Sequence, residues 1–467
     1  MTDLSKYKNI HCIGIGGVGL SAIARILLAR GYRVSGSDLN ESAITEKLKE
    51  NGAKIFNEHR AENVDGADLI IYSAAIADEN PEIRRAKELD IPIACRAEVL
   101  GTLMDEFSGS IAISGTHGKT TTTSMVSLIL NDANMDPTIL VGGELEEIGG
   151  NVRVGHGEYF VTEACEYRDS FLSLRPKIEV ILNIDSDHLD YFKDIEHIVS
   201  SFDKFAGEVP EGGMIVAYDS NPFVQQVIKY RTNVITYGYS ETSDYRIIDI
   251  GFDADGLPSF CVRNKGKKSD TIRLRVPGEH NILNAAAAYA CCSELGVQRS
   301  EIIRTLGNYK GTHRRFDPVG VTNKGIRIVD DYAHHPTEIR ATLSAAEKMK
   351  HGKLWCIFQP HTFTRTLALF DTFADAFALA DVLILADIYA AREKNIYEVS
   401  SKKLAEVIQS RHPGKDVIYI ASFKKIADYV KKNAEDGDLV ITMGAGDIYK
   451  VGRMILEEDD EHDKDRD

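Results

Sequence analysis

The sequence predicts an α/β protein built from three domains, and three observations carry this prediction. Strand-like and helix-like segments alternate along most of the chain, which is the pattern of parallel sheets covered by helices. Two glycine-rich turns, at residues 14–19 and 115–120, each lie between a strand-like and a helix-like segment. The length of 467 residues corresponds to about three domains of ordinary size.

Composition and charge narrow the class of protein. There are 55 Lys and Arg against 71 Asp and Glu, a net charge of −16, which argues against non-specific binding to nucleic acid or an anionic membrane. No apolar run approaches the ~20 residues that span a bilayer, and the first residues contain no apolar secretory core. The seven cysteines form no C-x-x-C pair, so we expect reduced thiols in a cytoplasmic protein. The acidic tail at 457–467 is predicted to be disordered.

Residues 1–108 form the first predicted domain, which begins in the manner of a Rossmann-like fold. A strand is predicted at 9–15, a helix at 18–30 and a second strand at 32–37. The turn after the first strand reads G-x-G-x-x-G, and its glycines allow the backbone to approach a diphosphate closely. Asp38 follows the second strand, where an acid can accept a hydrogen bond from a ribose hydroxyl. The candidate ligand-binding glycines are Gly14, Gly16, Gly17 and Gly19.

The residues alone leave the occupant of this first turn open. A nicotinamide dinucleotide fits the motif, but the domain ends near residue 108, which crowds the second half of a dinucleotide fold. A diphosphate that carries another group, such as a nucleotide sugar, fits as well, and so does a tight turn that binds nothing. Ser73 and Arg96 lie near the ends of further strands predicted at 68–74 and 91–96 and are additional substrate-binding candidates.

The second glycine turn follows a β-branched, apolar strand at 110–115 and precedes a helix-like run at 125–130. It reads G-x-x-G-K-T, and a strand, a glycine loop and a helix N-terminus in this order cradle a nucleotide triphosphate. Lys119 is placed to reach the β- and γ-phosphates, and Thr120 to ligate Mg²⁺. The usual phosphate loop is longer and would need a glycine at Ile113. The predicted ATP-binding residues are Gly115, Thr116, His117, Gly118, Lys119, Thr120 and Thr121.

The central domain, residues 109–313, is predicted to have a mixed, P-loop ATPase-like sheet and to hold the metal. Glu163 ends one apolar run, and His188 follows another. Because acids and a histidine at strand ends beside a phosphate loop suit Mg²⁺, we expect Thr120, Glu163 and His188 to be its ligands. Asn281 opens an Ala-rich helix, where an asparagine either caps the helix or faces the base of the nucleotide.

Residues 314–456 are predicted to form a third domain with a Rossmann-like, doubly wound sheet. Its strands are expected at 326–330, 354–358, 382–386, 416–420 and 438–442. Polar clusters follow the first, second and last of these strands, at the edge where open sheets bind ligands. The candidate residues in these clusters are Asp330, Asp331, His334, His335 and Arg365. Arg315, in the segment that enters the domain, is a candidate for placing a guanidinium on a transferring phosphate.

Six segments together resemble the Mur ligases, the ATP-dependent amide-forming enzymes of peptidoglycan precursor synthesis. They are residues 14–21, 115–121, 278–281, 314–317, 330–337 and 444–447, so the resemblance covers nearly the whole chain. The shortened phosphate loop is the form found in this family. The resemblance implies a first domain that binds the UDP of a nucleotide sugar and a central domain that binds ATP and Mg²⁺. It also implies a C-terminal domain that closes on ATP and the amino acid.

The resemblance also implies the substrates. In its closest branch, L-alanine is joined to the lactyl carboxylate of UDP-N-acetylmuramate through an acyl phosphate, which yields ADP and phosphate. In a second branch, which serves cell-wall recycling, a preformed tripeptide is joined to the same sugar. No nucleic acid or membrane partner is implied, and the sequence leaves monomer and homodimer open.

The resemblance assigns roles to single residues. The phosphate and metal positions of the family correspond to Lys119, Thr120, Glu163 and His188. Its ATP-contacting positions correspond to Asn281, Arg315, Asp330 and Asp331. Its amino-acid and muramyl carboxylate end corresponds to His334, His335 and Arg365, and we expect one of the two histidines to be the base for the attacking amine. Cys165 departs from the family, because relatives often carry an acid there.

Two other classes of protein explain part of these motifs. An NAD-dependent oxidoreductase explains the turn at 14–19 but leaves the phosphate loop without a role. A nucleotide-switched binding protein explains the phosphate loop alone, and it predicts a slow ATPase that no substrate accelerates.

Overall fold

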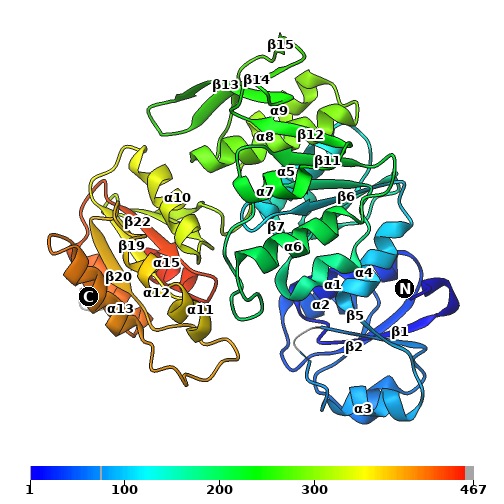
Figure 1. The fold of residues 1–467 in the computed structure, drawn as a ribbon. Coiled ribbons are helices and arrows are strands. Elements are labelled where there is room, and N and C mark those ends of the chain that lie inside the picture. Colours follow the sequence, from blue (N-terminus) through cyan, green and yellow to red (C-terminus); the bar gives the residue numbers. More distant parts are fainter. Residues whose placement is uncertain (1, 74–75, 458–467) are drawn as a thin grey trace, which may run out of the picture. The chain divides into compact units, whose positions relative to one another are not determined.

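Three parallel-dominated sheets organise the chain into three α/β domains, as the alternation of segments predicted (Figure 1). The structure is a computed structural model and describes residues 2–73 and 76–457. The acidic tail beyond residue 457 lies outside the described residues. The chain divides into two compact units, the first made of residues up to 184, 198–237 and 287–302, and the second of 185–197, 238–286 and the chain from 303 onward. None of the described helices combines the length and the apolar character that crossing a bilayer requires.

The N-terminal sheet is all parallel and has the order β3-β2-β1-β4-β5. Its strands are β1 (Asn9–Ile13), β2 (Arg33–Ser37), β3 (Lys54–Phe56), β4 (Leu69–Tyr72) and β5 (Ile93–Cys95). Its helices are α1 (Val18–Ala29), α2 (Ala43–Glu50), α3 (Pro81–Glu88) and α4 (Arg96–Asp105). The chain runs outward from β1 on one side and from β4 on the other, so the glycine turn after β1 lies at the switch point where open sheets bind ligands.

Strand β5 is shorter than the strand predicted at 91–96. It ends at Cys95, and Arg96 is the first residue of α4. The backbone N–H of Cys95 donates to the Glu98 carboxylate (2.8 Å), and this contact of a capping box fixes the start of the helix. Arg96 therefore projects from a helix N-terminus and not from a strand end.

The central sheet of the first unit follows the order β12-β11-β10-β6-β9-β7-β8. Its strands are β6 (Gly109–Ser114), β7 (Thr138–Leu145), β8 (Gly150–Arg153), β9 (Tyr159–Glu163), β10 (Ile178–Ile181), β11 (Met214–Tyr218) and β12 (Val234–Gly238). The pairs are parallel except that β7 and β8 are antiparallel. All residues of β6 are buried, so its apolar run forms a central strand covered on both faces.

Helix α5 (Lys119–Asp132) starts at the phosphate loop and is longer than the run predicted at 125–130. Its first turns contain four consecutive threonines, which are buried with the rest of the helix up to Leu130. Because threonine is a weak helix former, the pattern of apolar residues did not mark this beginning. Gly118 precedes the helix with a φ of 86°, in the left-handed region that glycine adopts without strain. Helices α6 (Ile195–Ala206) and α7 (Pro222–Ile228) follow later in the chain.

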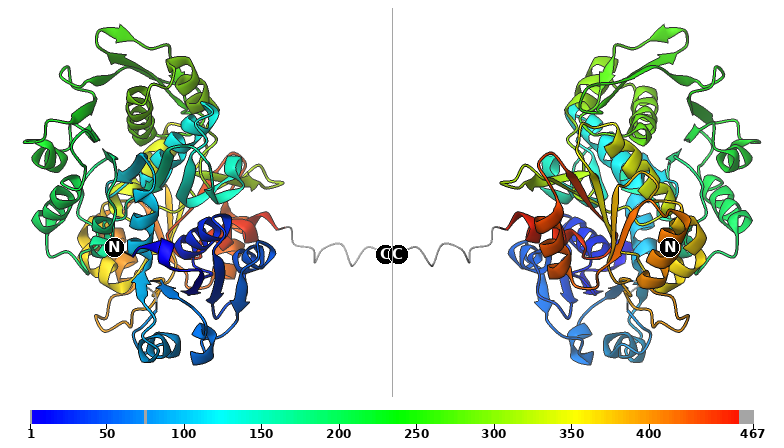
Figure 2. Two further views of the ribbon diagram at one scale, coloured as in Figure 1. Left: turned by 90° about the vertical axis from the view of Figure 1, so that its right-hand side faces the viewer. Right: turned by 90° about the vertical axis from the view of Figure 1, so that its left-hand side faces the viewer.

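A small antiparallel group of strands lies in the second unit, coloured green in Figures 1 and 2. Its members are β13 (Tyr245–Phe252), β14 (Pro258–Asn264), β15 (Lys267–Lys268) and β16 (Ile272–Arg273). Strand β14 pairs with each of the other three. Strand β16 is only two residues long. Helices α8 (Glu279–Glu294) and α9 (Arg299–Asn308) follow.

The C-terminal sheet of the second unit has the order β17-β18-β22-β19-β20-β21. The five predicted strands are β18 (Arg327–Asp331), β19 (Leu354–Phe358), β20 (Val382–Leu385), β21 (Asp416–Tyr419) and β22 (Leu439–Met443), all parallel. An additional strand, β17 (Asp317–Val321), pairs antiparallel with β18 at the edge. The helices are α10 (Pro336–Glu347), α11 (Phe363–Ala368), α12 (Phe370–Ala374), α13 (Ser401–Arg411), α14 (Phe423–Asn433) and α15 (Tyr449–Leu456).

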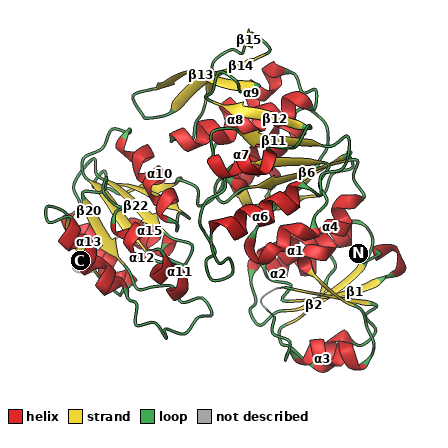
Figure 3. Ribbon diagram, viewed as in Figure 1, coloured by secondary structure: helices red, strands yellow, loops and turns green. Residues whose placement is uncertain are grey.

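Helices cover both faces of this sheet (Figure 3). Cys356 and Phe358 of β19 belong to an apolar cluster with residues of α10, α12 and α13. Trp355 and Ile357 of the same strand belong to a second cluster with residues of α14 and α15. Because β18, β22 and β19 are neighbours and parallel, their carboxyl ends lie side by side, and the polar clusters predicted after them share one edge.

Candidate active site

The phosphate loop lies between the carboxyl end of β6 and the first turn of α5. The Lys119 ammonium folds back over the loop and donates to the carbonyl oxygens of Gly115 (2.6 Å) and Thr116 (3.1 Å). The loop therefore holds one cation at the N-terminus of a buried helix. Such a helix end, with its unpaired N–H groups and its partial positive charge, suits an anionic phosphate.

Lys119 also forms a buried ion pair with Glu166, a residue that the sequence analysis gave no role. Its ammonium donates to both carboxylate oxygens of Glu166, at 2.8 and 3.2 Å, and only 3% of the Glu166 side chain is exposed. Burial alone would lower the pKa of Lys119, but Glu166, with smaller contributions from Cys165 and Glu163, raises it above its usual value. The lysine is therefore charged and held in place when no phosphate is bound.

Asn183, directly after β10, fastens the same loop from the neighbouring strand. Its backbone oxygen accepts a hydrogen bond from the Thr116 N–H (3.1 Å). Its side chain accepts from the His117 N–H (2.9 Å) and donates to the His117 carbonyl (3.0 Å). Asn183 was not predicted as a site residue from the sequence. Its only signal was a polar residue directly after a buried strand, and that strand proves to be the partner of β6.

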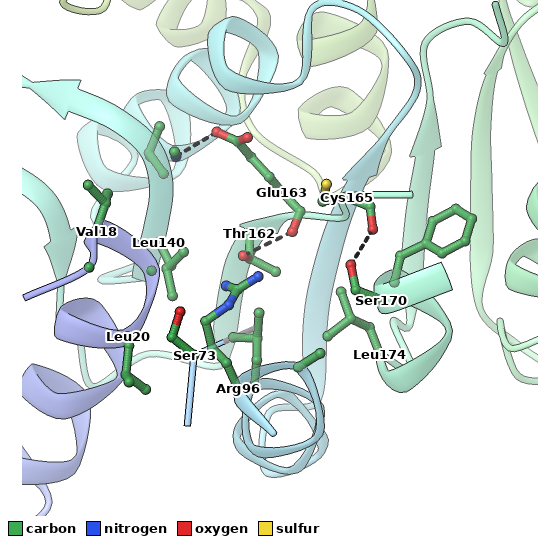
Figure 4. Close-up of a pocket in the computed structure, with 17 residues that line it drawn as sticks. Val18, Leu20, Ser73, Arg96, Leu140, Thr162, Glu163, Cys165, Ser170 and Leu174 are labelled. Carbon is green, nitrogen blue, oxygen red and sulfur yellow. Dashed lines mark hydrogen bonds between the residues drawn. The ribbon is translucent and has the colours of Figure 1, made fainter. Parts of the chain in front are cut away.

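A cavity of about 380 Å³ in the first unit extends from the glycine turn after β1 to the middle of β7 and the end of β9 (Figure 4). Among the predicted residues, it is lined by Gly17, Gly19, Ser73, Arg96 and Glu163. Gly14 and Gly16 belong to the same turn but are not among the lining residues. Residues predicted separately for a diphosphate and for a metal thus border one cavity.

Arg96 is the cationic group among the residues that line this cavity. A Cβ at position 19 would lie 2.9 Å from its Nη1, so a glycine is needed for the guanidinium to reach the start of α1. Asp38 plays a different part, because its carboxylate accepts from the backbone N–H groups of Gly16 (2.9 Å) and Asn40 (3.1 Å). In this structure Asp38 shapes the glycine turn, and its predicted contact with a ribose stays a prediction.

Glu163 and Cys165 form the opposite wall of the cavity. The Glu163 Oε1 accepts from the Gly142 N–H (2.6 Å), and Oε2 makes no hydrogen bond to the residues that the structure describes. Burial, and then the Glu166 carboxylate, raise the pKa of the Cys165 thiol above its usual value. The Ser170 hydroxyl donates to the Cys165 carbonyl (2.8 Å) and fixes the turn after β9 (Figure 4). This wall thus offers one available carboxylate oxygen and a neutral thiol.

In the second unit, Arg365 on α11 binds Asp187. Its Nε donates to one carboxylate oxygen (3.1 Å) and its Nη2 approaches the other (3.5 Å). Burial alone would raise the pKa of Asp187, but Arg365, followed by His188, His334 and His335, holds it far below its usual range. The predicted metal ligand His188 follows directly, with a φ of 54° and its Nε2 3.8 Å from Asp187 Oδ2. Thr120 and Glu163, the other two predicted ligands, lie in the first unit.

His361 belongs to the polar cluster predicted after the second strand of the C-terminal sheet, although no role of its own was assigned to it. Its Nδ1 accepts from Arg365 Nη1 (3.2 Å), and its ring stacks on Tyr389 with centroids 5.6 Å apart. Burial, with Arg365 adding to it, lowers the pKa of His361 to about 4. The next residue, Thr362, has a φ of 63° and ψ of 149°, a backbone conformation that a β-branched residue rarely takes. Such local strain is typical of functional sites, where the surrounding contacts hold it.

The two predicted base candidates have different environments. His335 caps α10: its Nδ1 accepts from the Thr337 N–H (3.2 Å), and its Nε2 donates to the Ser186 carbonyl (3.0 Å). Both ring nitrogens of His335 are thus engaged by the fold. His334 has one ring nitrogen, Nδ1, near the Tyr332 carbonyl (3.0 Å), and burial lowers its pKa to about 4. The structure therefore separates a scaffold histidine from one with an available nitrogen.

Asp330 holds the segment that enters the C-terminal domain. It accepts from the Thr442 hydroxyl (2.6 Å) and from Arg314 Nε (2.9 Å). Arg314 also donates to the carbonyl oxygens of Gly444 (2.7 Å) and Gly446 (3.2 Å). Arg314 thus helps to join the carboxyl edge of β18 to the loop after β22, where the Gly444 N–H also donates to the Asp331 carbonyl (3.1 Å).

Asp331 acts on the same segment through the backbone. It accepts from the N–H groups of Phe316 (2.8 Å) and Ala333 (2.7 Å), and burial raises its pKa to about 6 against the lowering effect of Arg315. The Arg315 guanidinium lies over the Tyr332 ring, 5.1 Å from its centroid. Both acids that were predicted to contact ATP therefore orient the arginine segment in this structure.

Asn281 lies at the start of α8 and is 6% exposed. Its Nδ2 donates to the Pro277 carbonyl (2.7 Å), and its Oδ1 accepts from Asn284 Nδ2 (3.0 Å). Asn281 is the third residue of α8, and these contacts are not those of the N-cap that one of the two alternatives predicted. A contact of Asn281 with the base of a nucleotide stays a prediction.

Three family models match successive parts of the chain. They are described as Mur ligase family, catalytic domain (residues 9–108), Mur ligase middle domain (residues 113–292) and Mur ligase, glutamate ligase domain (residues 314–446). The chain belongs to the Mur ligase family.

Known Mur ligases resemble it over almost their whole length. The UDP-N-acetylmuramate–L-alanine ligase of Caldanaerobacter subterraneus subsp. tengcongensis is 52% identical over 457 residues, which are 98% of this chain and 99% of that protein. The crystal structure of the UDP-N-acetylmuramate-alanine ligase of Thermotoga maritima matches with a TM-score of 0.80 and 29% identity, over 96% of this chain and 98% of that chain. A murein peptide ligase of Psychrobacter arcticus has a TM-score of 0.71 at 24% identity, over 96% and 98% of the two chains, and this likeness concerns the fold alone.

In this Mur ligase, the three site residues to which the sequence assigned no role share one property. Glu166, Asn183 and His361 each act on a motif residue from a different element of the chain. Glu166 lies 47 residues from Lys119 in the sequence, and Asn183 lies 66 residues from His117. His361 lies only 4 residues from Arg365, so only this last pair falls within one motif. The motif residues can be found in the sequence, but the residues that hold them depend on the fold.

Proposed function

We propose that this Mur ligase joins L-alanine to the lactyl carboxylate of UDP-N-acetylmuramate, with conversion of ATP to ADP and phosphate, in peptidoglycan precursor synthesis. The cavity of the first unit carries the proposal. The cavity begins at the glycine turn and at Arg96, and this turn and this cation suit a diphosphate. It reaches Glu163 and Cys165, which lie next to Lys119. A nucleotide sugar in this cavity would extend its carboxylate from one nucleotide-binding turn toward the other. The name of the 52% identical relative supports these substrates.

ATP and Mg²⁺ are the proposed cofactors. The residues present fit the metal, because the Thr120 hydroxyl and the available Glu163 Oε2 are the hard oxygen ligands that Mg²⁺ prefers. His188 is the third proposed ligand. When bound, Mg²⁺ would neutralise part of the phosphate charge. Lys119, with the N–H groups at the start of α5, would hold the phosphates, which requires that its ammonium turn from Glu166 to a phosphate oxygen.

The first proposed step forms an acyl phosphate. A lactyl carboxylate oxygen attacks the γ-phosphorus of ATP, the bond from that phosphorus to the bridging oxygen breaks, and ADP leaves. The protein contributes position and charge to such a step. Lys119 neutralises the phosphates, and Arg315 supplies a second cation for the transferring group. Asp330 and Asp331 act indirectly, since they orient the segment that carries Arg315.

The second proposed step forms the amide. The amine of L-alanine attacks the acyl carbon, a C–N bond forms, and the bond from that carbon to the phosphate oxygen breaks, so that phosphate leaves. A base must take the proton that the nitrogen loses. Between the two predicted histidines, we assign this part to His334, because both ring nitrogens of His335 are engaged by the fold. Arg365 is the proposed cation near the carboxylate of the amino acid.

A substrate panel tests the proposal. The purified chain is incubated with ATP, Mg²⁺, UDP-N-acetylmuramate and one amine, and ADP release is measured. We expect release with L-alanine and little with a preformed tripeptide. Release that requires the tripeptide would point to the recycling ligase instead. Release that is slow and independent of both sugar and amine would support a nucleotide-switched protein, and a change in reduced-nicotinamide absorbance would support an oxidoreductase.

A further inference from the structure

His334 is held in a single tautomer by the residues around it. Its Nδ1 lies 3.0 Å from the Tyr332 carbonyl oxygen, which can only accept a hydrogen bond, so Nδ1 carries the proton. The same nitrogen lies 3.3 Å from the Glu338 Oε2. The lone pair of the neutral ring is then on Nε2, to which no described residue hydrogen-bonds. A base with its second nitrogen fixed in this way is the arrangement used in catalytic histidine–carboxylate pairs.

Glu338 is itself fixed by the helix on which it lies. It occupies the third position of α10, where a carboxylate is favoured by the helix dipole and closes a capping box with His335. Its Oε2 accepts from the backbone N–H groups of His334 (3.0 Å) and His335 (3.2 Å). Two backbone donors thus aim one carboxylate oxygen at the ring of His334.

Burial keeps the His334 ring neutral, and the carboxylates beside it stabilise the imidazolium that forms when the ring accepts a proton. Burial lowers the pKa of His334 to about 4, Glu338 and Asp187 act to raise it, and Arg365 acts to lower it further. The rings of Tyr332 and His361 lie edge-on at 5.5 and 6.0 Å. These five side chains are the charged and titratable groups with the largest described effects on the ring or with rings in contact with it. Glu338 is the nearest of them with a charge that stabilises an imidazolium.

We infer that Glu338 is a positioning residue for the amide-forming step, which orients His334 so that Nε2 takes the proton lost by the attacking amine. As the C–N bond forms, the proton moves from nitrogen to Nε2, and the phosphate leaves with the electron pair of its C–O bond. The Glu338 carboxylate stabilises the imidazolium that results. The inference rests on the proposed function, because it needs an amine as the second substrate.

The variant Glu338→Gln separates this role from a structural one. Glutamine also closes a capping box, so α10 keeps its start, but the negative charge beside Nδ1 of His334 is lost. The matched control is Glu347→Gln, on the same helix with an exposed side chain. Two amines are compared in each variant: L-alanine, and hydroxylamine, which is unprotonated near neutral pH and attacks an acyl phosphate without help from a base.

For Glu338→Gln, we expect the rate with L-alanine to fall about ten- to hundred-fold, a fraction of what a positioned base contributes. The rate with hydroxylamine should stay within about twofold of wild type, since only the step that needs a base is affected. A loss shared equally by both amines would overturn the inference in favour of a structural role. Unchanged rates with both would overturn it as well. If the wild-type chain does not use L-alanine at all, the proposed function itself fails, which is a distinguishable result.

Discussion

The phosphate loop of the first unit and the histidine cluster of the second unit hold their charged groups in different ways. In the loop, one lysine is charged, buried and bound by Glu166 and by two backbone carbonyls. In the cluster, burial holds His334 and His361 neutral, and the charged groups beside them are the Arg365–Asp187 pair and Glu338. The first arrangement suits the binding of an anion, and the second suits the acceptance of a proton.

The two regions also differ in how far apart their members lie in the sequence. The loop is one continuous motif at the junction of β6 and α5. The cluster combines the ends of β18 and β19 with the segment around Asp187, which precedes them by more than a hundred residues. The backbone geometry of one short segment defines the phosphate loop. The histidine cluster instead depends on several side chains from separate parts of the chain.

Lys119→Ala should produce the largest effect, because it removes the only side-chain cation of the loop. We expect ADP release in the presence of both substrates to fall at least 10²–10³-fold, the order seen when one preorganised charge is lost. Lys204→Ala, an exposed lysine of α6, is the matched control. Turnover near the wild-type rate in Lys119→Ala would show that the loop does not carry the chemistry.

Glu179→Gln should change stability rather than activity. Glu179 is fully buried in β10; its Oε1 accepts from the Ser114 hydroxyl (2.8 Å), and its Oε2 has no hydrogen-bond partner. Asp187 forms an ion pair with Arg365, whereas the described residues show no ion pair to Glu179. Burial raises the pKa of Glu179 from 4.5 to about 8, against the smaller lowering effects of the Ser114 hydrogen bond and of Arg231. Between these pH values the folded protein binds one more proton than the unfolded chain, so this group makes stability fall as the pH rises.

The variant removes that pH dependence. At pH 8 we expect Glu179→Gln to be more stable than wild type by a few kcal/mol, on the order of what a shift of this size implies. Near pH 4.5 the two proteins should be similar. Denaturant unfolding at both pH values measures the difference. An equal difference at both pH values would show that Glu179 does not titrate in this range.

Asn183→Ala should have an intermediate effect. It removes the two hydrogen bonds by which the Asn183 side chain holds the part-buried backbone of His117. We expect the KM for ATP to rise about tenfold, which corresponds to about 1.4 kcal/mol for the hydrogen bonds lost. Initial rates over a range of ATP concentrations measure it, with the exposed Asn51→Ala as control. An unchanged KM would mean that the loop keeps its conformation without Asn183.

Cys165→Ser should have the smallest effect. The raised pKa of the thiol keeps it neutral, so a hydroxyl of similar size should change turnover by less than about twofold. The thiol should also react slowly with iodoacetamide in the folded protein. A loss of more than tenfold in Cys165→Ser would show that the sulfur itself contacts the substrate.

The sequence predicted the fold well where its pattern is local. The strands of the C-terminal sheet and the turns at 14–19 and 115–120 lie where their apolar runs and glycines indicated. The start of α5 was missed because threonines do not mark a helix. Arg96 was predicted at the end of a strand, but a capping contact of Glu98 makes it the first residue of α4. The ends of helices and strands depend on hydrogen bonds that the pattern of apolar residues does not predict.

The candidate site was predictable only in part, for a related reason. Lys119 could be named from the phosphate-loop motif and Glu163 from its place at a strand end. The contacts that hold them, from Glu166 and Gly142, follow from which strands become neighbours in the central sheet. The choice between His334 and His335 likewise needed their hydrogen-bond partners, since the two residues are adjacent and identical in type.

The most direct test of the account is the fate of the carboxylate oxygens of the sugar. UDP-N-acetylmuramate labelled with ¹⁸O in its lactyl carboxylate is turned over with ATP and L-alanine, and the phosphate released is analysed by ³¹P NMR. If the carboxylate attacks the γ-phosphorus, each phosphate carries one labelled oxygen. Phosphate released without the label during amide formation would contradict the acyl phosphate, and with it the assignment of both nucleotide-binding turns to a single reaction.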